Sequence, residues 1–217
     1  MSEPMPPLSP TEARVVAVLI EKEKTTPDVY PLSANALTTG CNQKTSRDPV
    51  LNLRESEVLD ALDSLRQREI IRENSGSRVL RYSHNFGRSY GTPAAATALL
   101  AMLMLRGPQT VSELRANCER LYPFSDSSSV EGYLEELAAR SQPLALRLPK
   151  QPGSREHRWC HLVCGAPAIP PESQDSAAPA PQRDSLAARV SQLEEQVQSL
   201  QQDMAALRAL LQSPDGN

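Results

Sequence analysis

The stretch ESEVLDALDSLRQREIIRENSGSRVLRY, residues 55–82, combines a helical pattern with two β-like runs. Its first part predicts a helix over about 55–69, because four apolar residues recur three and four positions apart on one face: Val58, Leu59, Leu62 and Leu65. The runs at 70–72 and 79–82 flank the turn sequence Asn74-Ser75-Gly76, and together they predict a β-hairpin.

Two further helices are expected before this stretch. The sequence SPTE at Ser9–Glu12 is typical of a capping box with a proline in the first helical turn. The prolines of TTPDVYPLS, residues 25–33, favour an extended passage. Ser33 then caps a short helix to about Cys41. Three helices followed by a hairpin are the order of a winged-helix domain.

The same order of elements repeats between residues 92 and 164. Thr110 with Glu113, and Ser128 with Glu131, predict two capping boxes. The expected elements are helices over about 92–105, 110–121 and from 128 onward, and strands at 146–148 and 158–163. The third of these helices has a predicted core face of Val130, Leu134 and Leu137.

The hexapeptides GSRVLR, 76–81, and GSREHR, 153–158, share the pattern G-S-R-x-x-R and lie 77 positions apart. We interpret them as equivalent hairpin tips, where glycine supplies a positive φ and the arginines face outward. The predicted fold class is mainly α with small β-hairpins (α+β), with tandem winged-helix domains at 9–91 and 92–164. We expect twin lobes whose hairpins project on the same side.

The C-terminal part has a different composition. Residues 165–185 are rich in Pro, Ala and Ser and predict a flexible linker, and residues 1–8 predict a disordered N-terminus. Residues 186–212 carry a heptad repeat typical of a parallel two-stranded coiled coil. The alternative is a single amphipathic helix that folds back on the domains. The predicted dimerisation residues are Leu186, Val190, Leu193, Val197, Leu200, Met204, Leu207 and Leu211.

The bulk composition argues against several classes of protein. The 217 residues carry a formal net charge of −3, so no overall basic field indicates nucleic acid. No stretch approaches the roughly 20 apolar residues of a membrane helix, and the N-terminus does not resemble a secretory signal. The four cysteines show no disulfide-scaffold pattern, which favours a cytoplasmic location.

Three runs carry a family resemblance: TTPDVYPLSANALTTGCNQKTSRDPVLNL, LRGPQTVSELRANCERLYPFSD and PGSREHRWCHL. They resemble the bacterial YceH family, whose members are largely uncharacterised, over about positions 8–164. The resemblance implies a tandem winged-helix fold that ends in a coiled coil, and it brings no activity or catalytic residue with it. The first hairpin here is shorter than the version usual in that family.

Candidate nucleic-acid-binding residues lie in three places. The loop 42–47 holds Asn, Gln, Lys and Arg, which are side chains that contact phosphates and base edges; the alternative is a structural loop. The stretches 66–81 and 147–158 each carry a net charge of +3, and the alternative is a solvated hairpin. The candidates are Lys44, Arg47, Arg68, Arg72, Arg78, Arg81, Arg147, Lys150, Arg155 and Arg158.

The third helices argue against sequence-specific reading of DNA, because carboxylates on their outer faces repel phosphate. Those faces are expected to carry Glu57, Asp60, Ser64 and Gln67 in the first copy, and Ser128, Glu131, Glu135 and Glu136 in the second.

A cysteine and histidine cluster near the end of the second copy invites a metal-site interpretation. Side chains along a strand point alternately to opposite faces, so His157 and His161 face one way and Cys160 and Cys164 face the other. The four side chains therefore do not converge, and we predict no metal site. No nucleophile has a plausible base, and no loop could cradle a phosphate. We therefore expect neither an enzyme nor a cofactor.

Two hypotheses follow from these patterns. The first is a cytoplasmic, dimeric, DNA-associated regulator whose basic wings contact the backbone. The second is a protein-interaction module, by analogy with bacterial condensin accessory proteins such as ScpB.

Overall fold

The computed structural model describes residues 5–75, 79–150, 153–166 and 198. The chain divides into two compact units, Met1–Ala168 and Ile169–Asn217, and every element described below belongs to the first unit. The eight predicted dimerisation residues lie outside the described residues, as does Arg78 of the first predicted hairpin tip.

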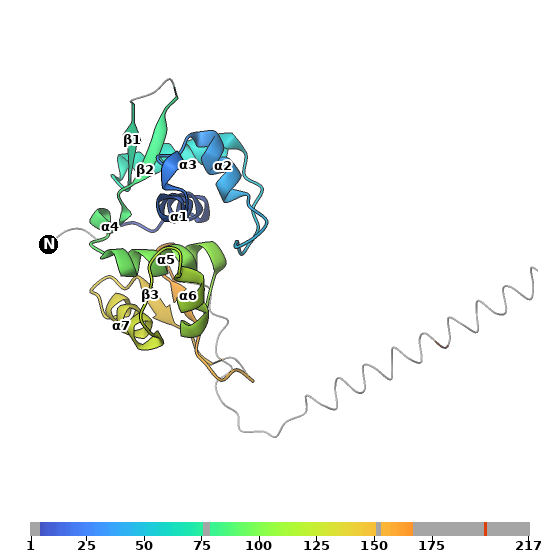
Figure 1. The fold of residues 1–217 in the computed structure, drawn as a ribbon, viewed down its shortest axis with the longest axis vertical. Coiled ribbons are helices and arrows are strands. Elements are labelled where there is room, and N and C mark those ends of the chain that lie inside the picture. Colours follow the sequence, from blue (N-terminus) through green and yellow to red (C-terminus); the bar gives the residue numbers. More distant parts are fainter. Residues whose placement is uncertain (1–4, 76–78, 151–152, 167–197, 199–217) are drawn as a thin grey trace, which may run out of the picture. The chain divides into compact units, whose positions relative to one another are not determined.

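The described part is a mixture of helices and small antiparallel hairpins, as expected for an α+β protein (Figure 1). We refer to the elements before residue 85 as the first half and to those after residue 92 as the second half. The first half contains α1 (Pro10–Thr25), η1 (Pro27–Val29), α2 (Ala34–Cys41), α3 (Glu55–Gln67), β1 (Ile71–Asn74) and β2 (Arg81–His84). After the short α4 (Phe86–Ser89), the second half contains α5 (Ala94–Arg106), α6 (Val111–Cys118), α7 (Ser127–Ala138), β3 (Ala145–Arg147) and β4 (Trp159–His161).

Local capping explains where most helices begin. The side chains of Ser9, Ser33 and Thr110 each accept a hydrogen bond from the first turn of α1, α2 and α6, as the sequence predicts. The predicted box at Ser128 is wrong. The cap of α7 is Asp126, whose Oδ1 accepts from the backbone N–H of Ser129 at 2.7 Å, so the helix starts at Ser127.

Two details of the first half also differ from the prediction. Leu59 was expected on the core face of α3, but its side chain is 40% exposed. Ala61 takes its place among the buried residues, because the core face lies further round the helix. The helix ends at Gln67 rather than Glu69, which has a positive φ of 56°. The second strand begins at Arg81, two residues later than the predicted run.

Each hairpin is extended by one more residue of the chain. In the first half, the backbones of Leu32 and Tyr82 exchange two hydrogen bonds, of 3.1 and 2.7 Å. In the second half, Gln109 and Trp159 do the same, at 3.0 and 2.7 Å. Leu32 and Gln109 are 77 positions apart in the sequence, and so are Tyr82 and Trp159. Leu32 and Gln109 each precede a helix cap. The two halves are therefore copies of one arrangement, although the sequence patterns did not predict this added strand.

The last arginine of each GSRxxR run has an equivalent place in its copy. Arg81 donates from Nη1 to the carbonyl of Pro31 at 2.7 Å, and Arg158 donates from Nη1 to the carbonyl of Pro108 at 2.8 Å. These prolines are also 77 positions apart. Gly153 of the second copy has the expected positive φ, at 80°. The last arginine of each run thus holds its hairpin against the segment before the second helix.

The two halves share one hydrophobic core, contrary to the expectation of twin lobes. Helices α1 and α5 pack against each other where the halves meet, and they lie side by side in the middle of Figure 1. Burial is continuous from Glu12 to Ile20 in α1 and from Ala95 to Leu105 in α5. A helix that is buried all round has no solvent face, so neither half is enclosed by its own elements alone.

The hairpins do not project on the same side, contrary to our expectation. The β1–β2 hairpin extends from one end of this unit, and the β3–β4 hairpin belongs to the lobe at the other end (Figure 1). The cause is the packing of α1 against α5, which leaves each hairpin on the outer part of its own half.

Candidate nucleic-acid interface

A groove runs over the start of two helices in the second half. It consists of two adjoining hollows, of about 370 and 400 Å³, that share Ser112 of α6 and Ser127 of α7. One hollow continues along the β3–β4 hairpin, and the other continues past Arg115 toward Phe124. We call these two hollows together the basic groove.

Basic side chains line both ends of the basic groove. Arg147, Lys150 and Arg155 belong to the hairpin and are exposed. Their side chains form no hydrogen bond or ion pair within the part of the chain that the structure describes. Arg115 lies at the other end, where its Nη2 donates to the carbonyl of Ser125 at 3.1 Å. The groove also has three carboxylates on its rim: Glu119, Glu131 and Glu156.

Helix geometry adds positive potential to the middle of the basic groove. Ser112 and Ser127 lie in the first turns of α6 and α7, where backbone N–H groups have no partner inside the helix. The aligned peptide dipoles give such a helix start a partial positive charge, which favours anions such as phosphate. The groove therefore combines three uncommitted cations with two helix starts. The carboxylates that line it, and those of Glu113 and Asp126 at the helix caps, oppose part of that field.

Arg158 has a structural role beside the groove. Its two terminal nitrogens donate to the carboxylate of Glu113 at 2.9 and 3.0 Å. The backbone N–H of Thr110 and then Arg158 hold the pKa of Glu113 below its usual value. Because the guanidinium also donates to Pro108, we remove Arg158 from the candidate phosphate contacts.

The first hairpin offers fewer uncommitted cations. Arg68 donates to the backbone carbonyls of Pro6 and Pro7, and its Nη1 lies 3.5 Å from Glu12. Arg81 is engaged by backbone carbonyls, as described above. Among the predicted residues of this hairpin that the structure describes, only Arg72 is exposed with a side chain that forms no hydrogen bond or ion pair. The first hairpin therefore presents little basic surface.

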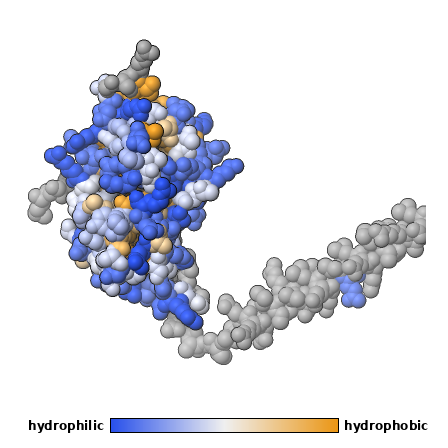
Figure 2. Space-filling view, in the orientation of Figure 1, coloured by the Kyte–Doolittle hydropathy of each residue, from blue (hydrophilic) through white to orange (hydrophobic). Residues whose placement is uncertain are grey.

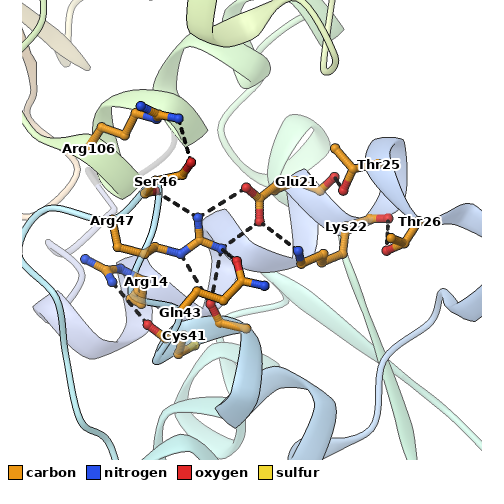
Figure 3. A network of polar contacts seen from close by, with 11 residues as sticks. Arg14, Glu21, Lys22, Thr25, Thr26, Cys41, Gln43, Ser46, Arg47 and Arg106 are labelled. Carbon is orange, nitrogen blue, oxygen red and sulfur yellow. Dashed lines mark hydrogen bonds and ion pairs between the residues drawn. The ribbon is translucent and has the colours of Figure 1, made fainter.

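The 42–47 loop is built as a structural support rather than a phosphate contact. The side-chain amide of Asn42 makes two hydrogen bonds with the backbone of Leu53, at 2.8 and 2.7 Å. Arg47 was predicted to bind nucleic acid, but its side chain is fully buried. Figure 3 shows its guanidinium directed at Glu21 of α1, with nitrogen–oxygen distances of 2.7 and 3.2 Å.

Further contacts around Arg47 explain why this loop keeps its shape. Its guanidinium also donates to the carbonyl of Gly40 and to the side-chain oxygen of Gln43 (Figure 3). The loop reaches the second half as well, because the N–H of Asp48 donates to the carbonyl of Leu105 at 2.8 Å. Lys44 is exposed and forms no hydrogen bond or ion pair within the described residues. Of the two loop candidates, only Lys44 remains accessible to a ligand.

The third helices partly follow the expectation of acidic outer faces. Glu135 and Glu136 of α7 are exposed. Ser64 of α3, however, points inward and donates to Glu12 of α1 at 2.5 Å, so it does not belong to the outer face.

The cysteines and histidines near the end of the second half do not gather into a site. Within the described ranges, no group of three or more potential metal ligands lies close together. Burial lowers the pKa of His161 to about 4 and raises that of Cys164 to about 11. The ring of His157 lines the basic groove, with Nδ1 2.9 Å from the carbonyl of Leu148.

The lining residues that sequence reasoning missed include Ser112, Arg115 and Ser127. They belong to helix starts and to an exposed helix face, where polar residues are usual. Only the folded arrangement of α6, α7 and the hairpin brings them together. The box at Thr110 was the one available signal, since it predicted an anion-favouring helix start beside Ser112.

The chain is similar to proteins without an assigned function. A family model described as "Protein of unknown function, DUF480" matches residues 8–154. A UPF0502 protein of Dechloromonas aromatica (strain RCB) is 50% identical over 212 residues, which cover 97% of each chain. A UPF0502 protein of Leptothrix cholodnii is 61% identical over 158 residues, covering 73% of this chain and 71% of its own. A UPF0502 protein of Burkholderia pseudomallei (strain K96243) is 51% identical over 209 residues, covering 94% and 86%.

One finding bears on membranes. None of the helices in the described ranges has both the length and the apolar character needed to cross a bilayer.

Proposed function

Since the chain belongs to the DUF480 family of proteins of unknown function, we propose from its own residues that it is a tandem winged-helix protein that binds the phosphate backbone of duplex DNA through its basic groove. The order of three helices and a hairpin in each half, with one added strand residue before the second helix, supports the winged-helix part of the proposal.

The observation that carries the proposal is the set of three uncommitted cations on the second hairpin. Arg147, Lys150 and Arg155 line one hollow together with the starts of α6 and α7. Wing cations of this kind contact phosphates and read no bases. The exposed carboxylates of α7 oppose close approach of that helix to DNA, so the binding is independent of sequence.

Salt dependence tests the proposal directly. Fluorescence anisotropy of a labelled random duplex would be measured between about 50 and 200 mM salt, where each phosphate contact contributes about 0.9 to the slope of log K against log salt. Replacing Arg147, Lys150 and Arg155 by alanine together should reduce that slope by about 3. The matched control is the double variant of Lys44→Ala and Arg72→Ala, which removes exposed cations outside the groove and should leave the slope nearly unchanged.

Two results would refute this function. The first is no binding of the wild-type chain at low salt. The second is an equal loss of slope in the groove variant and in the control variant, because the groove would then contribute no more than any exposed cation.

Dimerisation through residues 186–212 is part of the same proposal, and it would bring two basic grooves to one duplex. We also propose a cytoplasmic location, because the four cysteines of the described part are unpaired and free thiols are usual in a reducing compartment. Light scattering on the full chain and on a Leu193→Lys, Leu200→Lys variant tests the assembly. A dimer that becomes a monomer supports it, and a wild-type monomer rejects it.

A second candidate function, binding of a protein partner, rests on an apolar patch on the first half. Val79 and Leu80 beside β2 are 58% and 48% exposed, and Val29 of η1 is 55% exposed. Figure 2 shows apolar surface at the end of the molecule from which the first hairpin projects. Affinity capture after nuclease treatment distinguishes the two functions. A stoichiometric protein that the wild type still captures after nuclease treatment, and that Leu80→Asp does not capture, favours this second function.

A further inference from the structure

A further hollow, which shares no lining residue with the basic groove, lies where the two halves meet. Its volume is about 230 Å³, and its walls come from both halves: the end of α1, the end of β2, the start of α5 and Leu121 after α6. We call it the interhalf pocket. Since α1 and α5 pack directly against each other (Figure 1), any molecule held there contacts both halves at once.

Small side chains on α5 create this space. Ala94 and Ala98 are one helical turn apart and line the pocket together, and Gly87 of α4 adds no side chain. Ile20 and Ala98 are each only 3% exposed, so the inner wall is apolar and closed to solvent. Ala94 is exposed and marks the mouth. The pocket is therefore a partly open hollow with a mainly apolar surface.

The ionisable groups of the pocket come from the end of α1 and the end of β2. His84 at the end of β2 has Nε2 3.3 Å from the carboxylate of Glu23, and Glu23 also contacts the exposed Lys24 at 3.1 Å. Burial lowers the pKa of His84, so its ring is neutral near pH 7 and carries a single N–H. Glu23 offers an acceptor to Nε2, which favours the proton on that nitrogen and leaves Nδ1 as an acceptor.

That remaining acceptor has no donor among the described residues. Both ring nitrogens of His84 are inaccessible to solvent, and neither has a well-aligned hydrogen bond. A buried polar atom without a partner costs free energy that a hydrogen bond recovers. The hydroxyls of Thr92 and Thr97 do not supply it, because they bond to each other at 2.9 Å.

We propose that the interhalf pocket binds a small uncharged molecule with a flat apolar body and one N–H or O–H donor. The donor bonds to Nδ1 of His84 when the imidazole, whose nitrogens are covered in the unliganded chain, turns toward the pocket. The size fits this class. An apolar cavity of about 150 Å³ holds benzene, so about 230 Å³ accommodates a fused two-ring aromatic. Pockets of this kind, mostly apolar with a few convergent polar groups, are typical of sites between packed domains.

Indole and indene form a matched pair of probes, since they have nearly the same shape and only indole donates a hydrogen bond. Each would be titrated into the full chain while carbon-13 methyl spectra are recorded. Saturable shifts are expected at the methyls of Ile20, Ala98 and Leu121, and none at Leu134, which is buried in the second half away from the pocket. Indole should bind about three- to tenfold more tightly than indene, as one net hydrogen bond allows.

Two variants locate the site and the donor contact. Ala94→Trp fills the mouth and should weaken indole binding at least about tenfold. The control Ala36→Trp, on the exposed face of α2, should not change it. His84→Phe should abolish the preference for indole over indene and still allow both to bind. The methyl spectrum of each variant reports whether it is folded.

Each outcome decides the proposal. Pocket shifts that are blocked by Ala94→Trp, with a preference for indole that is lost in His84→Phe, support it. Absence of saturable shifts at the three pocket methyls in the wild-type chain overturns it, and so does equal affinity for the two probes. The wild-type titration alone is sufficient for both of these tests if a variant does not fold.

Discussion

Arg47→Ala should strongly destabilise the protein although Arg47 lies in a loop. The side chain is fully buried, and its guanidinium bonds to Glu21, to the carbonyl of Gly40 and to Gln43. Removing it leaves the Glu21 carboxylate, whose side chain is 12% exposed, with Lys22 at 3.5 Å as its only charged partner among the described residues. It also leaves the carbonyl of Gly40 without its two guanidinium donors.

The magnitude follows from the cost of breaking a buried ion pair from one side, which is about 3–5 kcal/mol. One effect opposes it. Burial, followed by the charge of Arg47, lowers the pKa of Arg14, so loss of Arg47 relieves a repulsion between two cations. We therefore expect the lower end of the range, about 3 kcal/mol of lost unfolding free energy. For a unit of this size, that corresponds to a fall in Tm of about 6–12 °C.

The assay is thermal and urea unfolding of the full chain, followed by far-ultraviolet circular dichroism. Lys44→Ala is the matched control, because it removes a cation from the same loop that is exposed and has no hydrogen bond or ion pair among the described residues. Its Tm should not differ measurably from that of the wild type. If Arg47→Ala lost less than about 1 kcal/mol, the buried pair would not support the loop, and the reasoning would be refuted.

Two other predictions concern glycine substitutions and pH. Gly40→Ala should lower the free energy of unfolding by about 1–3 kcal/mol, because the new Cβ would lie 2.7 Å from Cγ1 of Val18. Gly132→Ala in α7 should raise it by about 0.5–1 kcal/mol, because the new Cβ meets nothing within 4 Å. Urea unfolding of both variants checks the contrast. His161 has a folded pKa of about 4, below its unfolded value near 6.5, so the unfolded state binds its proton first and stability falls as the pH drops from about 6.5 to 4. That loss of unfolding free energy, on the order of 3 kcal/mol, should be absent in His161→Phe. An equal dependence of unfolding free energy on pH in the wild type and the variant would contradict the prediction.

The candidate interface could be predicted in part. Arg147, Lys150 and Arg155 were expected from the charge of the second hairpin, and the structure leaves their side chains uncommitted. The prediction did not foresee that Arg47 and Arg158 bind carboxylates of their own chain. From the sequence alone, an arginine in an ion pair cannot be distinguished from one that is free to contact phosphate, because the partner of its guanidinium is distant in the sequence.

The sequence by itself determined the local order of this protein. The caps of α1, α2 and α6 depend on contacts within a few residues. The duplication is visible as direct repetition of sequence in the two GSRxxR runs. For that reason the order of the amino acids is sufficient to predict them.

Only the tertiary structure decided how the copies combine. The packing of α1 on α5 joins the two halves through one core and places their hairpins at opposite ends of the unit. Contacts such as Arg47 with Glu21, 26 positions apart, and Arg106 with Ser46, 60 positions apart, have no periodic signal in the sequence. Their partners are selected by burial and distance in the folded chain, and those quantities do not exist until the halves have packed together.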